Sequence, residues 1–519
     1  PPPPPPAPLG CGCGGAHPPA SPLGVACGPP PPDAVILWTR VAPDEGGGDP
    51  VEVTWEIGTT PGLANLQSGT VTTGPDRDYT VKVDVTGLAA GTTYYYRFTV
   101  GSARSALGRT KTLPEGSTDR LRLAFCSCSN YPGGYFHAYR AIGERADLDV
   151  VLHLGDYTYE YAEDVFGDGS EIGRAPDPDA ETVMLDQYRR RLAQYRSDPD
   201  LQEAHRQHPW IVVWDDHEIA NDAWTGGAEN HDPDTQGSFG ERRDAALQAY
   251  FEWLPIRPQS TDRREIFRGF TFGDLVDLSM LETRLIGRDV QPLPTEDPNE
   301  PTRQLLGAEQ EEWLLARLRN ATAQWKLVGQ QTKFTRLAIG SDIDPLFYDS
   351  WSGYRGARQR ILEAIEADGI EGVAVLTGDI HASLAADLAI QPLPQEEDPT
   401  YDPQTGDGSL AVEIVAPAVS SPSLGDQARE QGFPAEALLT LVLNQNPQLK
   451  YLEIDERGYV LLDIDAARLQ AEWWHTGNVR EEAFSQSLAI ALRSDAGTNR
   501  LVEADGASEE RSDAPRLAP

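Results

Sequence analysis

The chain has 519 residues, with 43 Lys and Arg against 81 Asp and Glu, which gives a formal net charge of -38 and a pI near 4.5. An acidic chain of this kind repels long polyanions, so no groove that binds nucleic acid through its phosphates is expected. Hydrophobic residues make up 39% of the chain, which excludes wholesale disorder. The length predicts about three structural units.

Residues 1–32 are rich in Pro, Gly and Ala and predict a low-complexity leader. Cys11 follows Leu9-Gly10 in a faint likeness to a lipid-attachment site, which leaves cell-surface anchoring as an alternative. The sequence contains no run of about 18 apolar residues, so no transmembrane helix is predicted.

Residues 33–115 carry short β-rich runs broken by Gly, Pro or Asp, among them VEVTWEIG and TTYYYRFTV. Alternating apolar and β-branched residues with this punctuation predict a β-sandwich of the immunoglobulin or fibronectin-III type.

Residues 116–493 alternate short buried strands with helical stretches, which predicts an α/β domain. Four of these strands, LRLAFCS, DVVLHLGD, WIVVWDD and GVAVLTGD, each end in a polar cluster. Open α/β sheets place their active sites at the carboxyl ends of such strands. Residues 494–519 are acidic and rich in Ser and Ala, and they predict a disordered tail.

The polar cluster Asp215-Asp216-His217-Glu218 places three carboxylates and an imidazole in four consecutive positions. A fold does not build this repulsion after a buried strand without a cation to neutralise it. The other clusters add a thiol, a phenol, a second imidazole and further carboxylates. This mixture fits a trivalent or Lewis-acidic cation near Cys128, Tyr159 and His381. It also fits a hard, oxygen-binding cation near Asp216 and Asp379, with Asp156 between the two.

The segments HLGDYTYEY, WIVVWDDHEIAND and LTGDIHAS resemble the alkaline phosphatase D (PhoD-like) family of the calcineurin-like metallophosphoesterases. The segment SPLGVACGPPPPDAVILWTRV resembles the start of that family's N-terminal domain. The resemblance implies a four-layer αββα core of α/β class, preceded by an immunoglobulin-like domain. It also implies secretion by the twin-arginine route, hydrolysis of phosphate mono- and diesters, and a centre of Fe3+ and Ca2+.

The resemblance carries roles to individual positions of this sequence. The residues that match the iron side are Cys128, Asp156, Tyr159 and His381. Those that match the calcium side are Asp156, Asp216 and Asp379. His217 matches the substrate-facing histidine and, with Asp156, forms the expected catalytic pair. Possible additional ligands or ligand supports are Asn221 and Asp215, and possible substrate contacts are Arg196 and Asn130.

Our hypothesis for the reaction is attack on phosphorus by a water or hydroxide held by the metals, with His217 assisting the leaving oxygen. The expected partners are small phosphate esters, and the expected location is secreted, periplasmic or extracellular. A shifted substrate, either a phospholipid or a phosphotriester, is one alternative. A non-catalytic calcium-binding surface protein is another, although it leaves Cys128, Tyr159 and His381 without a role.

Two further features have a structural interpretation and a functional one. Cys126 is expected to be a core thiol, either on the face of the strand that points away from the site or as a neighbour of Cys128. The Arg-rich helix that contains Arg189, Arg190, Arg191 and Arg196 either steers phosphate or is a solvated face paired with nearby carboxylates, and the second interpretation is favoured.

Overall fold

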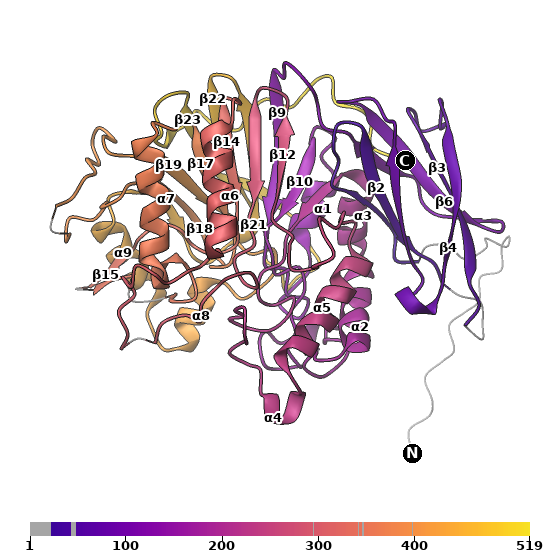
Figure 1. The fold of residues 1–519 in the computed structure, drawn as a ribbon, viewed down its shortest axis with the longest axis horizontal. Coiled ribbons are helices and arrows are strands. Elements are labelled where there is room, and N and C mark those ends of the chain that lie inside the picture. Colours follow the sequence, from indigo (N-terminus) through magenta and orange to yellow (C-terminus); the bar gives the residue numbers. More distant parts are fainter. Residues whose placement is uncertain (1–21, 43–47, 294, 341, 345–346, 397) are drawn as a thin grey trace.

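The computed structural model describes residues 22–42, 48–293, 295–340, 342–344, 347–396 and 398–519. Its first part holds two small antiparallel sheets, drawn in indigo and purple in Figure 1. One sheet contains β1 (Val25–Gly28), β2 (Ala34–Arg40) and β5 (Thr80–Thr86). The other contains β4 (Gln67–Thr73), β3 (Val51–Gly58), β6 (Thr93–Val100) and β7 (Ala103–Arg104), with β8 (Gly108–Lys111) paired to β6.

These two sheets share one hydrophobic core, to which Leu37 and Val53 contribute from opposite sheets. A two-sheet β domain at this position agrees with the sequence analysis, while its immunoglobulin or fibronectin-III type stays a prediction. The predicted leader extends too far, because β1 lies inside residues 1–32 and its Cys27 is fully buried. Cys27 also bridges to Pro209 of the following domain, so the short apolar segment is ordered by partners distant in sequence. Cys11 lies outside the described residues.

The remainder of the chain is built on two seven-stranded sheets. The first has the order β11 (Trp210–Val212), β10 (Val150–His153), β9 (Arg120–Cys126), β21 (Arg457–Asp465), β22 (Arg468–Thr476), β23 (Gln486–Asp495) and β24 (Val502–Glu503). The second has the order β12 (Arg268–Phe272), β13 (Val276–Met280), β14 (Trp325–Gly329), β17 (Val373–Thr377), β19 (Ala411–Val415), β18 (Ser383–Leu388) and β20 (Leu449–Glu453). Strands β9, β10 and β11 run parallel, as do β13, β14, β17 and β19.

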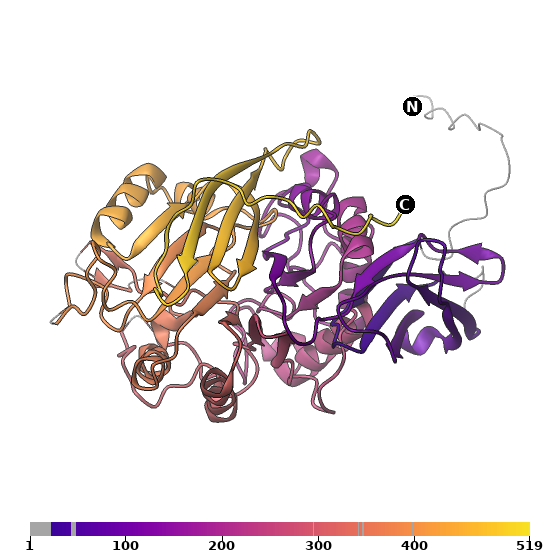
Figure 2. The same ribbon diagram turned by 90° about the horizontal axis from the view of Figure 1, so that it is seen from above.

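The two sheets pack face to face, as the view in Figure 2 shows. Indole N–H groups cross between them: Trp473 donates to the carbonyl of Val415 at 2.9 Å, and Trp325 donates to that of Asp465 at 2.8 Å. Helices α6 (Gly307–Asn320) and α7 (Arg355–Ala367) cover the second sheet through a separate apolar cluster. Helices α1 (His137–Gly143) and α3 (Pro199–Gln207) pack together beside the first sheet, and α2 (Leu185–Arg196) packs on α5 (Phe239–Trp253). The result is a mixed α/β fold with helices outside a pair of sheets.

The remaining elements are short. They are α4 (Pro233–Gln236), α8 (Leu424–Glu430), α9 (Ala435–Gln445), the hairpin of β15 (Ala338–Ile339) and β16 (Asp342–Ile343), and the 3-10 turns Pro75–Arg77, Ser170–Ile172 and Trp351–Gly353. Among the described residues, no helix is both long and apolar enough to cross a bilayer.

The predicted disordered tail is wrong. Residues 494–519 contain β24 and run along the α/β domain to the N-terminal one, as the yellow segment shows in Figure 2. The Gln207 side chain exchanges two hydrogen bonds with the backbone of Ala518, at 2.8 and 2.9 Å, and Arg511 pairs with Asp149 at 3.1 Å. The segment is ordered by polar contacts, which composition does not reveal.

Candidate active site

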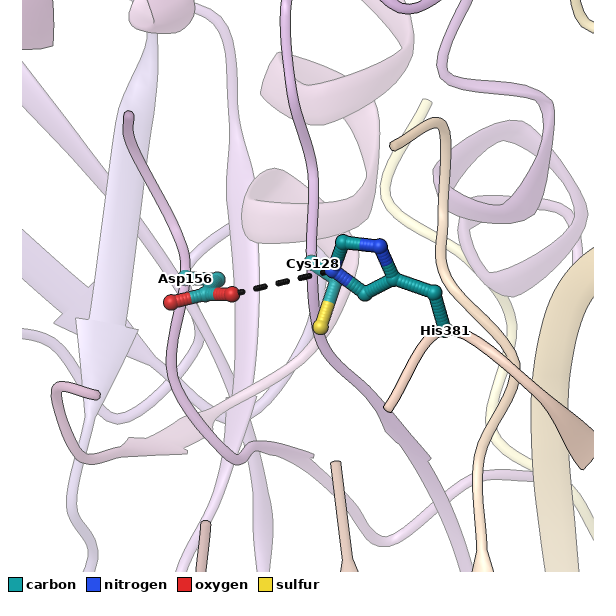
Figure 3. A group of neighbouring side chains, drawn as sticks. All are labelled: Cys128, Asp156 and His381. Atoms are coloured by element: carbon teal, nitrogen blue, oxygen red, sulfur yellow. Dashed lines mark ion pairs between the residues drawn. The ribbon is translucent and has the colours of Figure 1, made fainter. Parts of the chain in front are cut away.

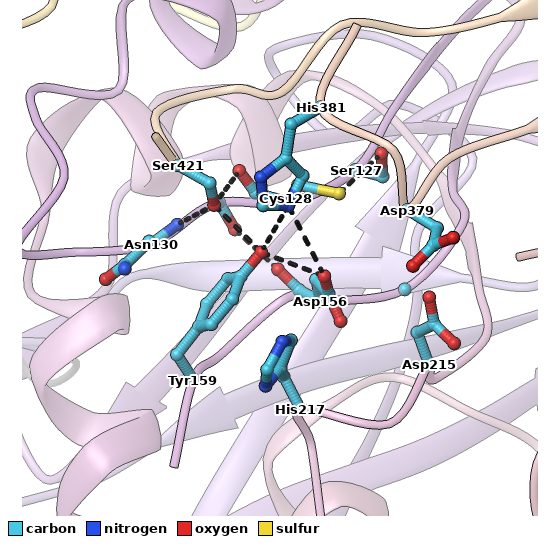
Figure 4. Close-up of polar contacts among 12 residues, drawn as sticks. Ser127, Cys128, Asn130, Asp156, Tyr159, Asp215, His217, Asp379, His381 and Ser421 are labelled. Atoms are coloured by element: carbon cyan, nitrogen blue, oxygen red, sulfur yellow. Dashed lines mark hydrogen bonds and ion pairs between the residues drawn. The ribbon is translucent and has the colours of Figure 1, made fainter. Parts of the chain in front are cut away.

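The predicted site residues follow four strands of the two facing sheets. Cys128 follows β9, Asp156 and Tyr159 follow β10, and the Asp215–Glu218 cluster follows β11. Asp379 and His381 follow β17 of the other sheet. Because β9, β10 and β11 are parallel and the two sheets face each other, these side chains come together, as Figure 4 shows for Cys128, Asp156 and His381.

Four of these residues have a left-handed backbone, which is uncommon for residues other than glycine. The φ angles are 63° at Cys128, 57° at Asp156, 66° at Asp379 and 52° at His381. Each such residue costs roughly 1–3 kcal/mol and persists only where the surroundings hold it. Strained turns of this kind aim each side chain back toward a common centre as soon as the strand ends.

The residues expected on the iron side do converge (Figure 3). Donor atoms of Cys128, Asp156 and His381 lie within 4.8 Å of one another. His381 Nε2 lies 4.0 Å from Asp156 Oδ2. The Tyr159 hydroxyl donates to the same carboxylate oxygen at 2.8 Å and lies 3.1 Å from His381 Nε2. A thiol, a carboxylate, a phenol and an imidazole therefore surround one point.

The protonation chemistry of these donors suits a metal. His381 Nδ1 donates to the carbonyl of Pro422 at 2.7 Å, which leaves the Nε2 lone pair directed at the centre. Burial raises the pKa of the Cys128 thiol and of the Tyr159 phenol well above their usual values, and the nearby Asp156 carboxylate adds to both shifts. Both groups keep their protons unless a cation takes their place.

A second donor group, of Asp156, Asp216 and His217, lies beside the first, again with its donor atoms within 4.8 Å of one another. Asp156 belongs to both groups, which is the position expected of a bridging ligand. Its Oδ1 atom is buried and has no hydrogen-bond partner. An unpartnered carboxylate oxygen in this position is costly unless a cation binds it, so the residues fit two adjacent metal ions.

A residue that sequence reasoning missed, Arg284, lies among the carboxylates expected on the calcium side of the site. Its Nε donates to Asp215, while Nη2 lies 3.5 Å from Asp216 and 3.6 Å from Asp379. Nη1 lies 3.4 Å from Asp349. Asp215, predicted as a possible ligand, is therefore paired with a guanidinium. The sequence predicts a metal as the cation that neutralises the acidic cluster, and nothing in the LETRL segment identifies this arginine as a further cation beside it.

His217 is held between a carboxylate and an aromatic ring. Its Nδ1 lies 2.8 Å from Glu160 Oε2, and its ring stacks on Tyr159 at a centroid distance of 4.3 Å. Burial acts to lower the pKa of His217, but Glu160, Asp216 and Asp156 outweigh it and raise that pKa well above the usual value. These carboxylates favour the protonated form of the imidazole in the metal-free site.

Two of the remaining predicted residues support loops. The Asn130 side chain donates to the carbonyl of Phe166 at 2.7 Å, and the backbone N–H of Asn221 donates to Glu160 at 2.7 Å. The prediction that Arg196 contacts substrate is wrong, because its guanidinium lies 4.6 Å over the ring of Trp38 in the N-terminal domain.

Arg189 and Arg190 pair with Glu252 and Asp177, as the structural interpretation expected. Arg191 differs, because it is buried and donates to the backbone carbonyls of Tyr159 and Pro178. Cys126, also as expected, is a buried free thiol whose Sγ contacts the Leu152 carbonyl at 3.9 Å.

Comparison with known proteins identifies one family. Residues 123–473 match the PhoD-like phosphatase family, and residues 15–114 match the N-terminal domain of PhoD-like phosphatases. Alkaline phosphatase D of Bacillus subtilis (strain 168) is 36% identical over 462 residues, which cover 85% of this chain and 75% of that protein.

Solved structures give the same result. The structure of PhoD superposes with a TM-score of 0.84 at 32% identity, covering 95% of this chain and 94% of the other. The purple acid phosphatase PPD1 from yellow lupin seeds shares the fold, with a TM-score of 0.56 at 14% identity, covering 86% of this chain and 71% of that one. With the extent of the sequence match and the convergence of its motifs at one site, the chain belongs to the PhoD-like phosphatase family.

Proposed function

We propose that the protein hydrolyses small phosphate mono- and diesters in a metal-dependent reaction that requires Fe3+ and Ca2+. The observation that carries this proposal is the position of Asp156 at the junction of two donor groups, with one buried oxygen unpartnered. The name of the Bacillus subtilis relative, alkaline phosphatase D, supports the ester class.

The donor atoms of the two groups suit different ions. Thiolate, phenolate and imidazole ligands from Cys128, Tyr159 and His381 suit Fe3+, whereas the carboxylates of Asp216 and Asp379 suit Ca2+. When bound, the two ions supply neutralisation of phosphate charge and a lowered pKa for a water nucleophile. Asp156, which belongs to both donor groups, would contribute to holding both ions.

A residue beside the proposed ions protonates the leaving group. Glu160 engages Nδ1 of His217, so Nε2 is the nitrogen left to carry the transferable proton. His217 donates that proton to the oxygen of the departing alcohol, while the Glu160 carboxylate stabilises the imidazolium before transfer. Arg284 stays paired with Asp215 and holds the calcium-side carboxylates in place.

We also propose that the enzyme acts outside the cytoplasm, secreted to the periplasm or the medium. A ligand set that uses calcium fits compartments where that ion is plentiful, because extracellular modules bind it with Kd values of about 10⁻⁴–10⁻³ M. Cell fractionation of the native host with an antibody to the protein tests this location, and recovery in the cytoplasmic fraction would contradict it.

A matched pair of cysteine variants tests the catalytic proposal. Cys128→Ser removes the proposed iron thiolate, whereas Cys126→Ser alters a buried thiol two residues earlier in the chain, at the end of β9. We expect Cys128→Ser to lose iron by elemental analysis and to lose hydrolysis of bis(p-nitrophenyl) phosphate by at least about 100-fold. Cys126→Ser should keep both.

The wild-type protein should also lose activity to a chelator and regain it with added iron and calcium. An iron-free preparation of full activity would overturn the iron assignment, and full activity after chelation would overturn metal dependence.

A further inference from the structure

Two loops carry the ligands at the junction of the proposed metals. We define the first ligand loop as residues 154–161, after β10, and the second as residues 214–222, after β11. The loops touch closely: a Cβ at Gly155 would lie 2.4 Å from Cβ of Asp215. Their relative position fixes the distance between Asp156 on one loop and Asp216 on the other.

Glu218 of the second loop binds the backbone of the first. Its Oε2 accepts from the N–H of Asp156 at 3.1 Å, and its Oε1 accepts from the N–H of Tyr157 at 2.5 Å. Oε2 also accepts from the N–H of Asp215 in its own loop at 2.8 Å. Both carboxylate oxygens of this buried side chain thus accept hydrogen bonds from backbone N–H groups, two in the first ligand loop and one in the second.

Glu160 of the first loop makes the reciprocal contacts. Its Oε1 accepts from the N–H of Asn221 at 2.7 Å, and its Oε2 pairs with Nδ1 of His217 at 2.8 Å, both in the second loop. Oε1 also accepts from the Asn230 side chain at 2.8 Å. Each loop therefore contributes one buried glutamate whose carboxylate binds the other loop.

We propose that Glu218 and Glu160 are positioning residues that form a reciprocal clasp between the two ligand loops. The inference rests on the proposed metal centre, because the clasp acts by fixing Asp156 against Asp216 and His217. Buried carboxylates are expensive, and two that serve backbone N–H groups of ligand-bearing turns stabilise a geometry rather than a contact with substrate. The strained backbone at Asp156 is held by the same hydrogen bonds.

Glu218→Gln tests the clasp, because an amide replaces one acceptor oxygen by an NH2 group. In one orientation that group faces the N–H of Tyr157, and in the other it faces the N–H groups of Asp156 and Asp215. We expect a loss of metal affinity of about 10–100-fold when metal-stripped protein is titrated with Ca2+ or iron alone. The Tm of the same samples shows whether the variant is folded.

Two control variants separate positioning from general effects. Glu472→Gln changes another buried glutamate, on β22, which accepts from the backbone of Ser508 at 2.6 Å and from the Trp474 indole at 3.0 Å. It should lower Tm and leave metal affinity unchanged. Glu229→Gln removes an exposed charge that accepts from the Asn221 side-chain amide at 3.3 Å and from no backbone N–H that holds the ligand loops together, and it should leave both unchanged.

The outcomes distinguish the clasp from the metal centre itself. If the wild-type protein binds neither metal, the proposed function fails. If the wild type binds them and folded Glu218→Gln binds equally well, the clasp is overturned. Should Glu218→Gln not fold, Glu160→Gln is the second variant, with the same expected loss, and unfolding of both would overturn the positioning role in favour of a purely structural one.

Discussion

Phe166 forms part of an aromatic wall beside the proposed proton donor. Its ring lies 6.2 Å from that of His217 with an interplanar angle of 16°, and 5.6 Å from that of Tyr159. Tyr161 adds a ring at 5.2 Å from His217. A leaving group that accepts its proton from His217 departs along this wall, so an aryl group would contact it more than a small alkyl group.

We expect Phe166→Ala to lower kcat/KM for an aryl ester such as p-nitrophenyl phosphate by roughly 2–12-fold, from an aromatic contact of about 0.5–1.5 kcal/mol. Hydrolysis of an alkyl ester such as glycerol phosphate should change little. Phe433→Ala, which truncates an aromatic ring that is 60% exposed, serves as the control. Equal losses on both substrates would show that Phe166 supports the site instead of receiving the leaving group.

Single residues differ in how much of their role the sequence reveals. Cys128, Asp156 and His381 could be predicted because each follows a buried strand, where α/β sheets collect functional groups. Arg284 could not, since its role depends on carboxylates brought from three other segments. Arg196 was misjudged because an arginine near a motif in sequence can turn toward another domain, as this one does.

At the scale of elements, the end of β10 depends on one glycine. Gly155 has a φ of 111°, and an added Cβ would lie 2.4 Å from Cβ and 2.6 Å from the backbone nitrogen of Asp215. Neither loop has free space there, because the hydrogen bonds of Glu218 hold the two together. A side chain at this position has to separate the ligand loops.

Gly155→Ala should therefore cost about 3 kcal/mol or more in free energy of unfolding, from backbone strain and overlap together, and should abolish activity. Gly87→Ala is the matched control, with a φ of 75° and no atom within 4 Å of the added Cβ. It should cost only about 1–2 kcal/mol and leave activity intact. Urea unfolding of both variants measures the difference, and equal costs would show that close approach at Gly155 does not matter.

Helices and strands could be predicted where a local pattern of apolar residues marks them. Segments ordered by contacts with residues distant in sequence could not. Strands such as β10 and β17 are continuous apolar runs, which the sequence indicates directly. The left-handed turns after them have only a weak local signal, because Asp and His adopt that conformation more often than most residues but in a small minority of cases. The C-terminal segment was mistaken for disorder because its order comes from contacts with residues such as Gln207.

For the whole molecule, the net charge of -38 sets how stability responds to pH. Acidification protonates surface carboxylates and relieves their repulsion, which by itself favours the compact state. Buried histidines act in the opposite direction. Burial lowers the pKa of His153 to about 3 and that of His475 to about 4, and it lowers those of His205 and His208 well below the usual value.

These histidines stay neutral in the folded protein but take up protons in the unfolded chain once the pH falls below about 6.5. Stability contributed by His475 is therefore lost between pH 6.5 and about 4, at up to about 1.4 kcal/mol per pH unit. We expect the free energy of unfolding of metal-stripped protein, measured by urea unfolding, to fall from pH 6.5 to 5. In His475→Gln its slope against pH should be smaller by the contribution of about one proton. Parallel profiles for the two proteins would contradict the assignment, and repeating the series at high salt removes the opposing contribution of surface repulsion.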